Sequence, residues 1–503
     1  LSKGEKAIWT KTRPMSVAKK MASGMLWGLL EKVGQQILSF AAFLIVVRMI
    51  GPEEYGLVGL CVVFTGFATM IFAGIADAII SQQITEGSRL STLFWAVILV
   101  GLILSLITFL SAEFFAGLFK DDRLVPLVRL ISVLPFLFAL STVPTVLVNA
   151  RLDFKLIAVR SIIGTLAGGI CGVILALNGF GAYALVWQQI AIWVCINLII
   201  WPAAGWVPRM TFNRLELFGV LAPGGKMTVS MIITFVENQV PRLIIGFSLG
   251  AVSVGLFSFA WRIFWSMKEG LFLPVISVMF PAFAKIKNDP AESIRLINRI
   301  VSITGFIALP AFAGGAMTSP QFVPLFFGIK WIAAVGVLQF FIFAMIPGTF
   351  LLIIREVLRA HGKIGVFVRF QAIIVALSIA TMLLLVNRGL QSMVFGVLVI
   401  AFITFPFAVW VSARASGFSF GRSFGRLWVP VTATAAMVLS IYAIQVTVLP
   451  FFPPFVDLAF LVLAGASVYI AVYALLDFRQ LADFVKAGGR IRTLFKGKSQ
   501  TFK

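Results

Sequence analysis

The sequence predicts an all-α integral membrane protein with about 14 transmembrane helices. Hydrophobic residues make up 60% of the 503 residues and charged residues only 12%, whereas soluble domains average roughly 45–50% and about 25%. The apolar residues form long runs, and each run is near the ~20 residues that a helix needs to cross a bilayer. Short breaks that carry charged residues, glycine or proline separate the runs.

Cutting the sequence at these breaks gives the predicted spans in order. The first six lie near 22–48, 55–80, 90–114, 124–149, 156–178 and 181–206. After the polar stretch VPRMTFNRLE, the other eight lie near 217–248, 252–283, 296–319, 331–358, 364–386, 391–412, 427–449 and 455–476.

Lysine and arginine are distributed unevenly between the two ends of the spans. The basic tails and the even-numbered loops hold most of them, and the opposite ends hold only Arg48, Lys120, Arg123, Lys330 and Arg388. Because an excess of Lys and Arg marks cytoplasmic loops, we expect both termini in the cytoplasm. The formal charge of +22 then follows largely from topology, with a contribution from anionic membrane lipids. It requires no nucleic-acid partner.

A shift of 199 positions aligns the stretch LIVVRMIGPEEYGL (44–57) with LIIGFSLGAVSVGL (243–256). Gly51 then falls on Gly250, and Gly56 on Gly255, in two predicted outer hairpins. Because an even number of spans separates the copies, the repeat is parallel and predicts two six-helix lobes. The predicted parts are a basic cytoplasmic N-terminus (1–21), an N-lobe (22–206), a cytoplasmic linker (207–216), a C-lobe (217–412), two further spans (413–476) and a basic cytoplasmic tail (477–503).

Ionisable side chains within the spans are the candidate functional residues, because they are costly in lipid and normally face a cavity or one another. Glu237 lies 13 residues before Gly250 and Arg262 lies 12 after it, so both are predicted roughly 18–20 Å from the hairpin tip and opposite each other. Such a pair either satisfies itself or lines a cavity. The candidate substrate-binding residues are Lys226, Arg242, Arg262, Trp265 and Lys268, and the candidate coupling residues are Glu31, Asp77, Glu237 and Glu269.

The chemistry of these residues leaves alternatives open. Arg242 and Lys226 either contact a phosphate or extend toward the membrane surface, and Trp265 either stacks on a sugar ring or fills an interface. Arg160 and Arg369 are predicted to lie at the cytoplasmic interface. The four acids are the candidates for coupling transport to H⁺ or Na⁺. The surplus of Lys and Arg suits an anionic, phosphate-bearing cargo, whereas an extruder of cationic drugs would need a surplus of acid.

Several stretches resemble the MOP flippase superfamily, and most of all its polysaccharide transporter branch, the Wzx-type lipid-linked oligosaccharide flippases. They are GPEEYGL after the first span, its GxxxxGL echo after the seventh, GIADAIISQQ (74–83), VLVNARLDFKLIAV (146–159) and VMFPAFAKIKND (278–289). The resemblance implies a V-shaped alternating-access transporter with a central cavity lined by the first, second, seventh and eighth spans.

The cargo that the resemblance implies is an oligosaccharide on a polyprenyl diphosphate. It would be moved from the cytoplasmic to the outer leaflet of the bacterial inner membrane for exopolysaccharide or lipopolysaccharide biosynthesis, with a polymerase or export machinery as partner. The alternatives are a cation-coupled multidrug or metabolite antiporter of the MATE type and a lipid II flippase.

Enzyme chemistry finds little support in the sequence. The outer loops are short, the cytoplasmic loops lack a DxD pair, and no GxxxxGK[ST] stretch is present to bind ATP. The three cysteines show no CxxC spacing, and His361 is the only histidine, which disfavours a metal site. We therefore expect a transporter without a cofactor or a metal.

Overall fold

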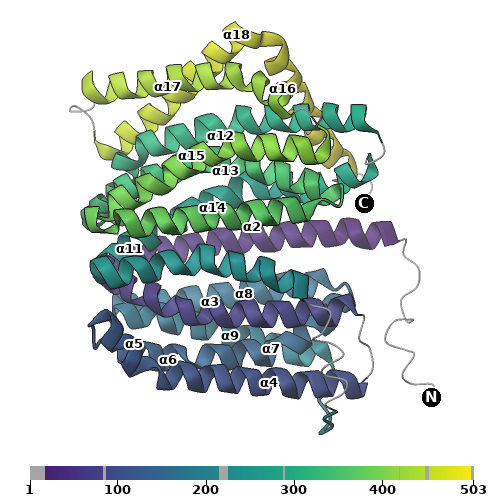
Figure 1. Ribbon diagram of the computed structural model, residues 1–503, viewed down its shortest axis with the longest axis vertical. Coiled ribbons are helices and arrows are strands. Elements are labelled where there is room, and N and C mark those ends of the chain that lie inside the picture. The colour runs from purple at the N-terminus through teal and green to yellow at the C-terminus, as the bar shows by residue number, and fades with distance from the viewer. Residues whose placement is uncertain are drawn as a thin grey trace. The chain divides into compact units, whose positions relative to one another are not determined.

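The computed structural model describes residues 17–82, 87–213, 225–286, 289–418, 420–447 and 453–499. Within these ranges the chain is helical and contains no strand (Figure 1). The helices are α2 (Val17–Met49), α3 (Pro52–Ser81), α4 (Gly87–Leu110), α5 (Ala112–Phe119), α6 (Leu124–Ile131), α7 (Val133–Ala150), α8 (Phe154–Leu177), α9 (Ala182–Ala204), α11 (Gly225–Lys285), α12 (Pro290–Phe327), α13 (Val335–Ala360), α14 (Ile364–Leu385), α15 (Leu390–Ser416), α16 (Phe420–Phe424), α17 (Trp428–Thr447) and α18 (Pro454–Ser499).

Thirteen helical stretches of the described chain are long and apolar enough to cross a membrane. One of them, Met231–Leu271, contains Gly250, whose φ of 78° and ψ of 178° divide α11 into two arms, 225–249 and 251–285. This stretch overlaps the seventh and eighth predicted spans, and the other stretches match the remaining predicted spans one for one. The predicted all-α membrane fold class is therefore confirmed, and the protein is a multi-pass membrane protein.

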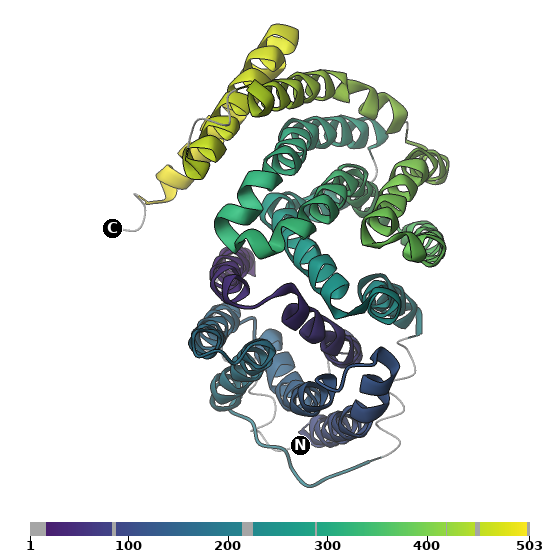
Figure 2. The ribbon, with the colours of Figure 1, turned by 90° about the vertical axis from the view of Figure 1, so that its left-hand side faces the viewer.

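The helices form two compact units, residues 1–259 and 260–503. The boundary falls within the second arm of α11, so the first unit holds the first arm and the hairpin tip. The predicted lobes (22–206 and 217–412) rest on the sequence repeat, and they stay a prediction. Within each unit the long helices run roughly alongside one another (Figures 1 and 2).

In the first unit, α8 packs against both α2 and α9, and α4 packs against α7. Close approach of α8 to α9 requires glycine, because a Cβ added at Gly168 would lie 2.7 Å from the backbone oxygen of Gln188. Small residues of this kind let membrane helices approach closely where lipid supplies no hydrophobic driving force. Buried side chains of α3, α4 and α7, such as Ile79, Phe94 and Val143, form an apolar core.

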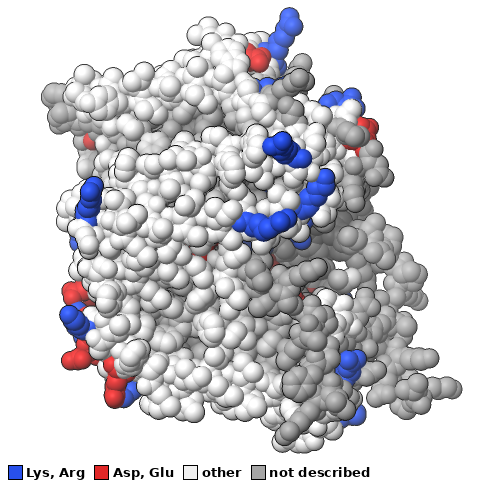
Figure 3. All heavy atoms as spheres, in the orientation of Figure 1, with Lys and Arg blue, Asp and Glu red and all other residues white. Residues whose placement is uncertain are grey.

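In the second unit, α12 packs against α13 and α17, and α13 packs against α15. An apolar core around Phe283, Ile354 and Phe420 joins α11 to α13 and α16. The hydroxyl of Tyr469 on α18 donates a 2.9 Å hydrogen bond to the backbone oxygen of Phe306 on α12. In both units the charged side chains seen in Figure 3 lie mostly toward the ends of the helices, as expected for bilayer-crossing elements.

Candidate functional site

The outer hairpins predicted from the repeat meet at a glycine contact between α3 and α11. A Cβ added at Gly56 would lie 1.8 Å from the backbone oxygen of Ala251, and one added at Gly255 would lie 1.7 Å from the backbone oxygen of Pro52. The shift of 199 converts Pro52 into Ala251 and Gly56 into Gly255. The repeat therefore relates the Gly56–Ala251 contact to the Gly255–Pro52 contact, and the close approach in each explains why both copies have a glycine at this position.

Arg242 is buried in the α11 hairpin. Its Nη1 donates to the backbone oxygen of Asn238 at 2.6 Å and to the side-chain oxygen of Gln239 at 2.9 Å, and its Nε donates to the hydroxyl of Ser258 at 3.3 Å. Ser258 lies on the second arm, so the arginine joins the two arms. A buried guanidinium needs such acceptors to offset its desolvation. This geometry favours a stabilising role for Arg242 over either predicted alternative.

Two polar pairs lie where α2, α7 and α8 of the first unit pack. The carboxylate of Glu31 accepts a 2.8 Å hydrogen bond from the hydroxyl of Ser161, and Nη1 of the neighbouring Arg160 donates to the hydroxyl of Thr145 at 2.7 Å. Glu31 and Arg160 attract each other electrostatically. Arg160 is half-buried and bonded within the helix bundle, and its place at the cytoplasmic interface stays a prediction.

In the second unit, the structure brings together two of the predicted substrate-binding residues, Trp265 and Lys268. The ammonium of Lys268 lies 4.1 Å from the centroid of the Trp265 ring and 6.0 Å from that of Phe264. Trp261 stacks on Phe264 with the ring centroids 5.0 Å apart, and both rings contact Phe341 of α13. A half-buried row of aromatic rings thus ends at a positive charge.

The remaining candidates are distributed along α3 and α11. Glu237 and Glu269 are exposed, whereas Asp77, near the end of α3, and Arg262 are half-buried. Glu237 belongs to the first unit and Arg262 to the second, and their pairing stays a prediction. The backbone of Lys226 begins α11, but its side chain lies outside the described residues.

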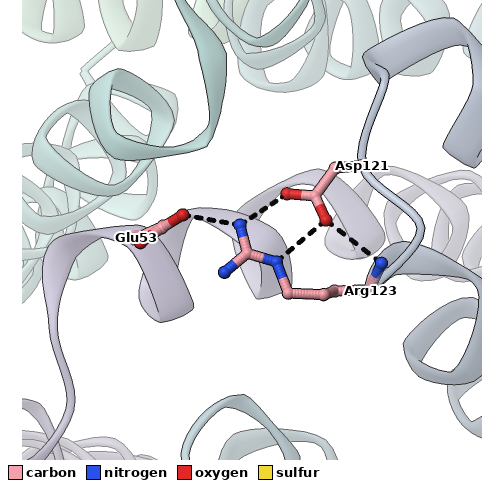
Figure 4. A network of polar contacts seen from close by, with 3 residues as sticks. All are labelled: Glu53, Asp121 and Arg123. Carbon is pink, nitrogen blue, oxygen red and sulfur yellow. Dashed lines mark hydrogen bonds and ion pairs between the residues drawn. The ribbon is translucent and has the colours of Figure 1, made fainter.

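The two glutamates of GPEEYGL anchor the first turn of α3. The carboxylate of Glu54 accepts a hydrogen bond from the backbone nitrogen of Gly51 at 3.3 Å, which caps the helix. Glu53 forms an ion pair with Arg123, whose Nε and Nη2 also donate to Asp121 at 2.9 and 2.8 Å (Figure 4). Hydrogen bonds from Arg123 hold the pKa of Asp121 below its usual value.

The lowered pKa of Asp121 predicts a small, pH-dependent effect of Arg123→Gln on the stability of the fold. A carboxyl whose pKa is lowered by folding stabilises the fold above its ordinary pKa of about 4, and the contribution is lost as the pH falls through the lowered pKa. Because the side chain of Arg123 is 55% exposed, we expect a loss below about 1 kcal/mol. Thermal unfolding of the purified protein should show a lower Tm for the variant at pH 7 and a smaller difference at pH 3. An equal difference at both values would contradict the assignment, and exposed Arg388 provides the control, Arg388→Gln.

Comparison with known proteins identifies the family. The model of the polysaccharide biosynthesis protein family matches residues 45–336, more than half of the chain. The chain belongs to this family. The succinoglycan biosynthesis transport protein ExoT of Rhizobium meliloti (strain 1021) is 28% identical over 65% of this chain and 66% of that protein. The lipopolysaccharide biosynthesis protein WzxC of Escherichia coli (strain K12) is 26% identical over 65% of this chain and 67% of that protein. The chain thus spans about two thirds of the length of these family relatives.

The structure of the lipid II flippase MurJ in an inward closed conformation superposes with a TM-score of 0.74, covering 91% of this chain and 100% of that one. At 16% identity this likeness shows the fold alone. The family match confirms the predicted resemblance to the polysaccharide transporters, and the fold agrees with it.

Proposed function

We propose that the protein is a transporter that flips a polyprenyl-diphosphate-linked oligosaccharide from the cytoplasmic to the outer leaflet of the bacterial inner membrane. It would serve the biosynthesis of an exopolysaccharide or lipopolysaccharide, without catalytic activity of its own and in cooperation with a polymerase or export machinery. Both termini would lie in the cytoplasm.

The observation that carries this proposal is the Trp265–Lys268 cluster in a member of the polysaccharide biosynthesis protein family. Its aromatic rings offer flat apolar faces to the C–H faces of sugar rings. The ammonium of Lys268, 4.1 Å from the Trp265 centroid, can pair with a phosphate as a point charge. A cargo that joins sugars to a diphosphate fits both parts, and the names of the two relatives, which concern succinoglycan and lipopolysaccharide, support this class.

The decisive experiment deletes the gene in its host and restores it on a plasmid. We expect the deletion to abolish the surface or secreted polysaccharide and to leave its lipid-linked repeat unit on the cytoplasmic face, where an added impermeant glycosidase cannot reach it in intact spheroplasts. Restoration of the gene should reverse both effects. Normal polysaccharide in the deletion strain would contradict the proposal.

The same strain tests the alternatives. A MATE-type antiporter predicts altered susceptibility to cationic drugs with normal polysaccharide. A lipid II flippase predicts lysis and loss of peptidoglycan synthesis on depletion. A viable strain with unchanged drug susceptibility and no polysaccharide would leave the oligosaccharide flippase alone among the three.

Glu31 is the coupling residue that the contacts favour among the four candidate acids, because it lies on α2 in a polar cluster with a hydroxyl 2.8 Å away and a nearby arginine. We predict that Glu31→Gln, which keeps the shape but cannot release a proton or bind Na⁺ as an anion, lowers gradient-driven flipping at least about tenfold, a loss of ~1.4 kcal/mol of coupling.

The measurement uses proteoliposomes with an imposed pH gradient or, separately, an imposed Na⁺ gradient. Flipping without a gradient should change little in Glu31→Gln, and the control Glu292→Gln, which alters an exposed acid on the first turn of α12, should retain gradient dependence. Full gradient dependence in Glu31→Gln would exclude this residue and leave Asp77, Glu237 and Glu269 as candidates.

A further inference from the structure

The last turns of α13 carry a buried acid between two arginines. The side chain of Glu356 is 2% exposed, and its Oε1 lies 2.9 Å from Nε and 2.8 Å from Nη2 of Arg355. Its Oε2 lies 3.7 Å from Nη1 of Arg359. The two arginine side chains are 38% and 57% exposed. One buried carboxylate thus lies between two partly exposed guanidinium groups, and the cluster has a net charge of +1.

The bias of cytoplasmic loops toward Lys and Arg does not account for Glu356. A buried carboxylate is unfavourable unless a partner compensates its charge, and an exposed basic surface needs no buried acid. Donation from both Nε and Nη2 fixes the plane of the Arg355 guanidinium. Among the described residues Arg355 donates to no other acceptor, so the opposite edge of its guanidinium is oriented by Glu356 and available to a ligand.

The position of this cluster along the helix brings it near the lipid head groups. α13 has 26 residues and is therefore about 39 Å long, against a hydrocarbon core of about 30 Å. Its end lies in the turn to α14 that is predicted to face the cytoplasm. With the excess of about 9 Å shared between the two ends of the helix, Arg359 lies at the level of the head groups, and Arg355 and Glu356 lie within about one turn of that level.

Neighbouring helix ends add positive charge at the same place. Exposed Lys363, in the turn after α13, donates a 2.6 Å hydrogen bond to the backbone oxygen of Ala415 at the end of α15. Arg414 next to it is exposed and lies over the Trp410 ring, 5.1 Å from its centroid. These cations raise the local attraction for anions, while the contacts of Nε and Nη2 with Glu356 orient the guanidinium of Arg355.

We propose that Arg355 and Arg359, positioned by Glu356, bind the phosphate of a membrane lipid at this end of α13. The ligand chemistry is an anionic phosphate ester, supplied either by the diester of an anionic phospholipid or by the diphosphate of a polyprenyl carrier. The site is distinct from the Trp265–Lys268 cluster, and it does not depend on the proposed flippase activity.

The test measures lipid binding to the purified full-length protein by native mass spectrometry. The probes are dioleoyl phosphatidylglycerol, dioleoyl phosphatidylcholine as the zwitterionic reference, and farnesyl diphosphate. We expect Arg359→Ala to weaken binding of at least one anionic probe about tenfold or more, as for the loss of a charge-assisted hydrogen bond. The matched control is Arg369→Ala, which removes an exposed arginine at the start of α14 that donates to the backbone oxygen of Gly365; it should change binding less than about twofold.

The variant Glu356→Gln distinguishes a site in which Glu356 orients Arg355 from a surface that attracts anions only through its positive charge. The variant adds a net positive charge, so a diffuse surface would bind anions more tightly, whereas loss of the carboxylate that orients Arg355 should weaken binding several-fold. Arg355→Ala alone would leave the buried Glu356 without its nearest partner and can prevent folding. The double variant Arg355→Gln/Glu356→Gln, which removes both charges, is therefore measured in its place, beside Glu356→Gln. Tighter binding to Glu356→Gln, or equal losses in Arg359→Ala and Arg369→Ala, would overturn the proposal.

The two lipid sources give different results in the same titration. Preference for farnesyl diphosphate over phosphatidylglycerol of about tenfold or more would identify the carrier diphosphate as the ligand. Equal or weaker binding of farnesyl diphosphate, with phosphatidylglycerol preferred over phosphatidylcholine, would identify a bilayer head group. Failure of both anionic probes to exceed phosphatidylcholine would refute the site, whatever the deletion strain shows about polysaccharide.

Discussion

Gly56→Ala is expected to abolish accumulation of the folded protein or to lower its Tm strongly. The added Cβ would lie 1.8 Å from the backbone oxygen of Ala251 and 2.7 Å from its carbonyl carbon. Both are backbone atoms, so no side-chain rotation relieves the clash and α3 and α11 must separate. Overpacking typically costs about 1–3 kcal/mol, and occasionally more. For a contact this short we expect a cost of about 3 kcal/mol or more. Thermal unfolding of the purified protein and its abundance in membranes measure the effect.

The repeat supplies a second, independent variant. Gly255→Ala would place its Cβ 1.7 Å from the backbone oxygen of Pro52, so it should destabilise the protein about as much as Gly56→Ala. The control is Gly270→Ala, also in α11, where no described atom beyond the glycine's chain neighbours and the backbone of its own helix lies within 4 Å of the added Cβ. There alanine should be neutral or stabilise by about 0.5–1 kcal/mol, because it favours the helix over the unfolded chain. Destabilisation by Gly270→Ala equal to that of Gly56→Ala would show that the helix contact is not responsible.

The sequence predicts this fold well because a bilayer limits the choices. Each crossing needs about 20 apolar residues, and the backbone must satisfy its own hydrogen bonds, so hydropathy alone locates the helices. The break at Gly250 was also predictable, since the repeat aligns it with Gly51 in the first hairpin. At Gly250 the structure shows a φ of 78°, a conformation that glycine adopts readily.

Side-chain partners were harder to predict, because the fold brings together residues that are distant in sequence. Ser161 and Glu31 are 130 positions apart, and nothing local marks the serine as the partner of that acid. The position of Arg160 near the start of a span likewise gives no sign of its acceptor, Thr145, which the packing of α7 against α8 brings within 2.7 Å. Proximity along one helix was more informative, since Trp265 and Lys268 are three residues apart and therefore share a helix face.

The buried acid Glu356 was missed by sequence reasoning for a related reason. Its stretch, REVLR, lies at the end of a predicted span, where basic residues are expected from topology alone. The glutamate within it was the available signal, because an acid at a cytoplasmic helix end runs against both the positive bias and the helix dipole. Burial, which only the packing of the second unit reveals, is what distinguishes it from a solvated acid.

Lys268→Ala is expected to lower polysaccharide export by about tenfold to 150-fold with normal membrane abundance. The range follows from the roughly 1.5–3 kcal/mol that hydrogen bonds to charged groups contribute, if the ammonium binds the cargo phosphate. Lys268→Arg keeps the charge and can stack on Trp265, so it should retain most of the export. Trp265→Ala should lower export through loss of the sugar-facing ring, and Trp265→Phe should lower it less. Export is measured as secreted polysaccharide in the deletion strain that carries each variant.

A matched control separates cargo binding from the general loss of a cation–π contact. In the first unit the ammonium of Lys155 lies 5.8 Å from the centroid of the Trp27 ring, so Lys155→Ala removes a contact of the same type from the unit that does not contain Lys268. If Lys268 acts on the cargo, Lys155→Ala leaves export near the wild-type level while Lys268→Ala lowers it. Equal export from both variants would mean that the Lys268 ammonium only packs on its aromatic neighbours. The phosphate of the cargo would then need another partner, with Arg262 and Lys226 as the candidates.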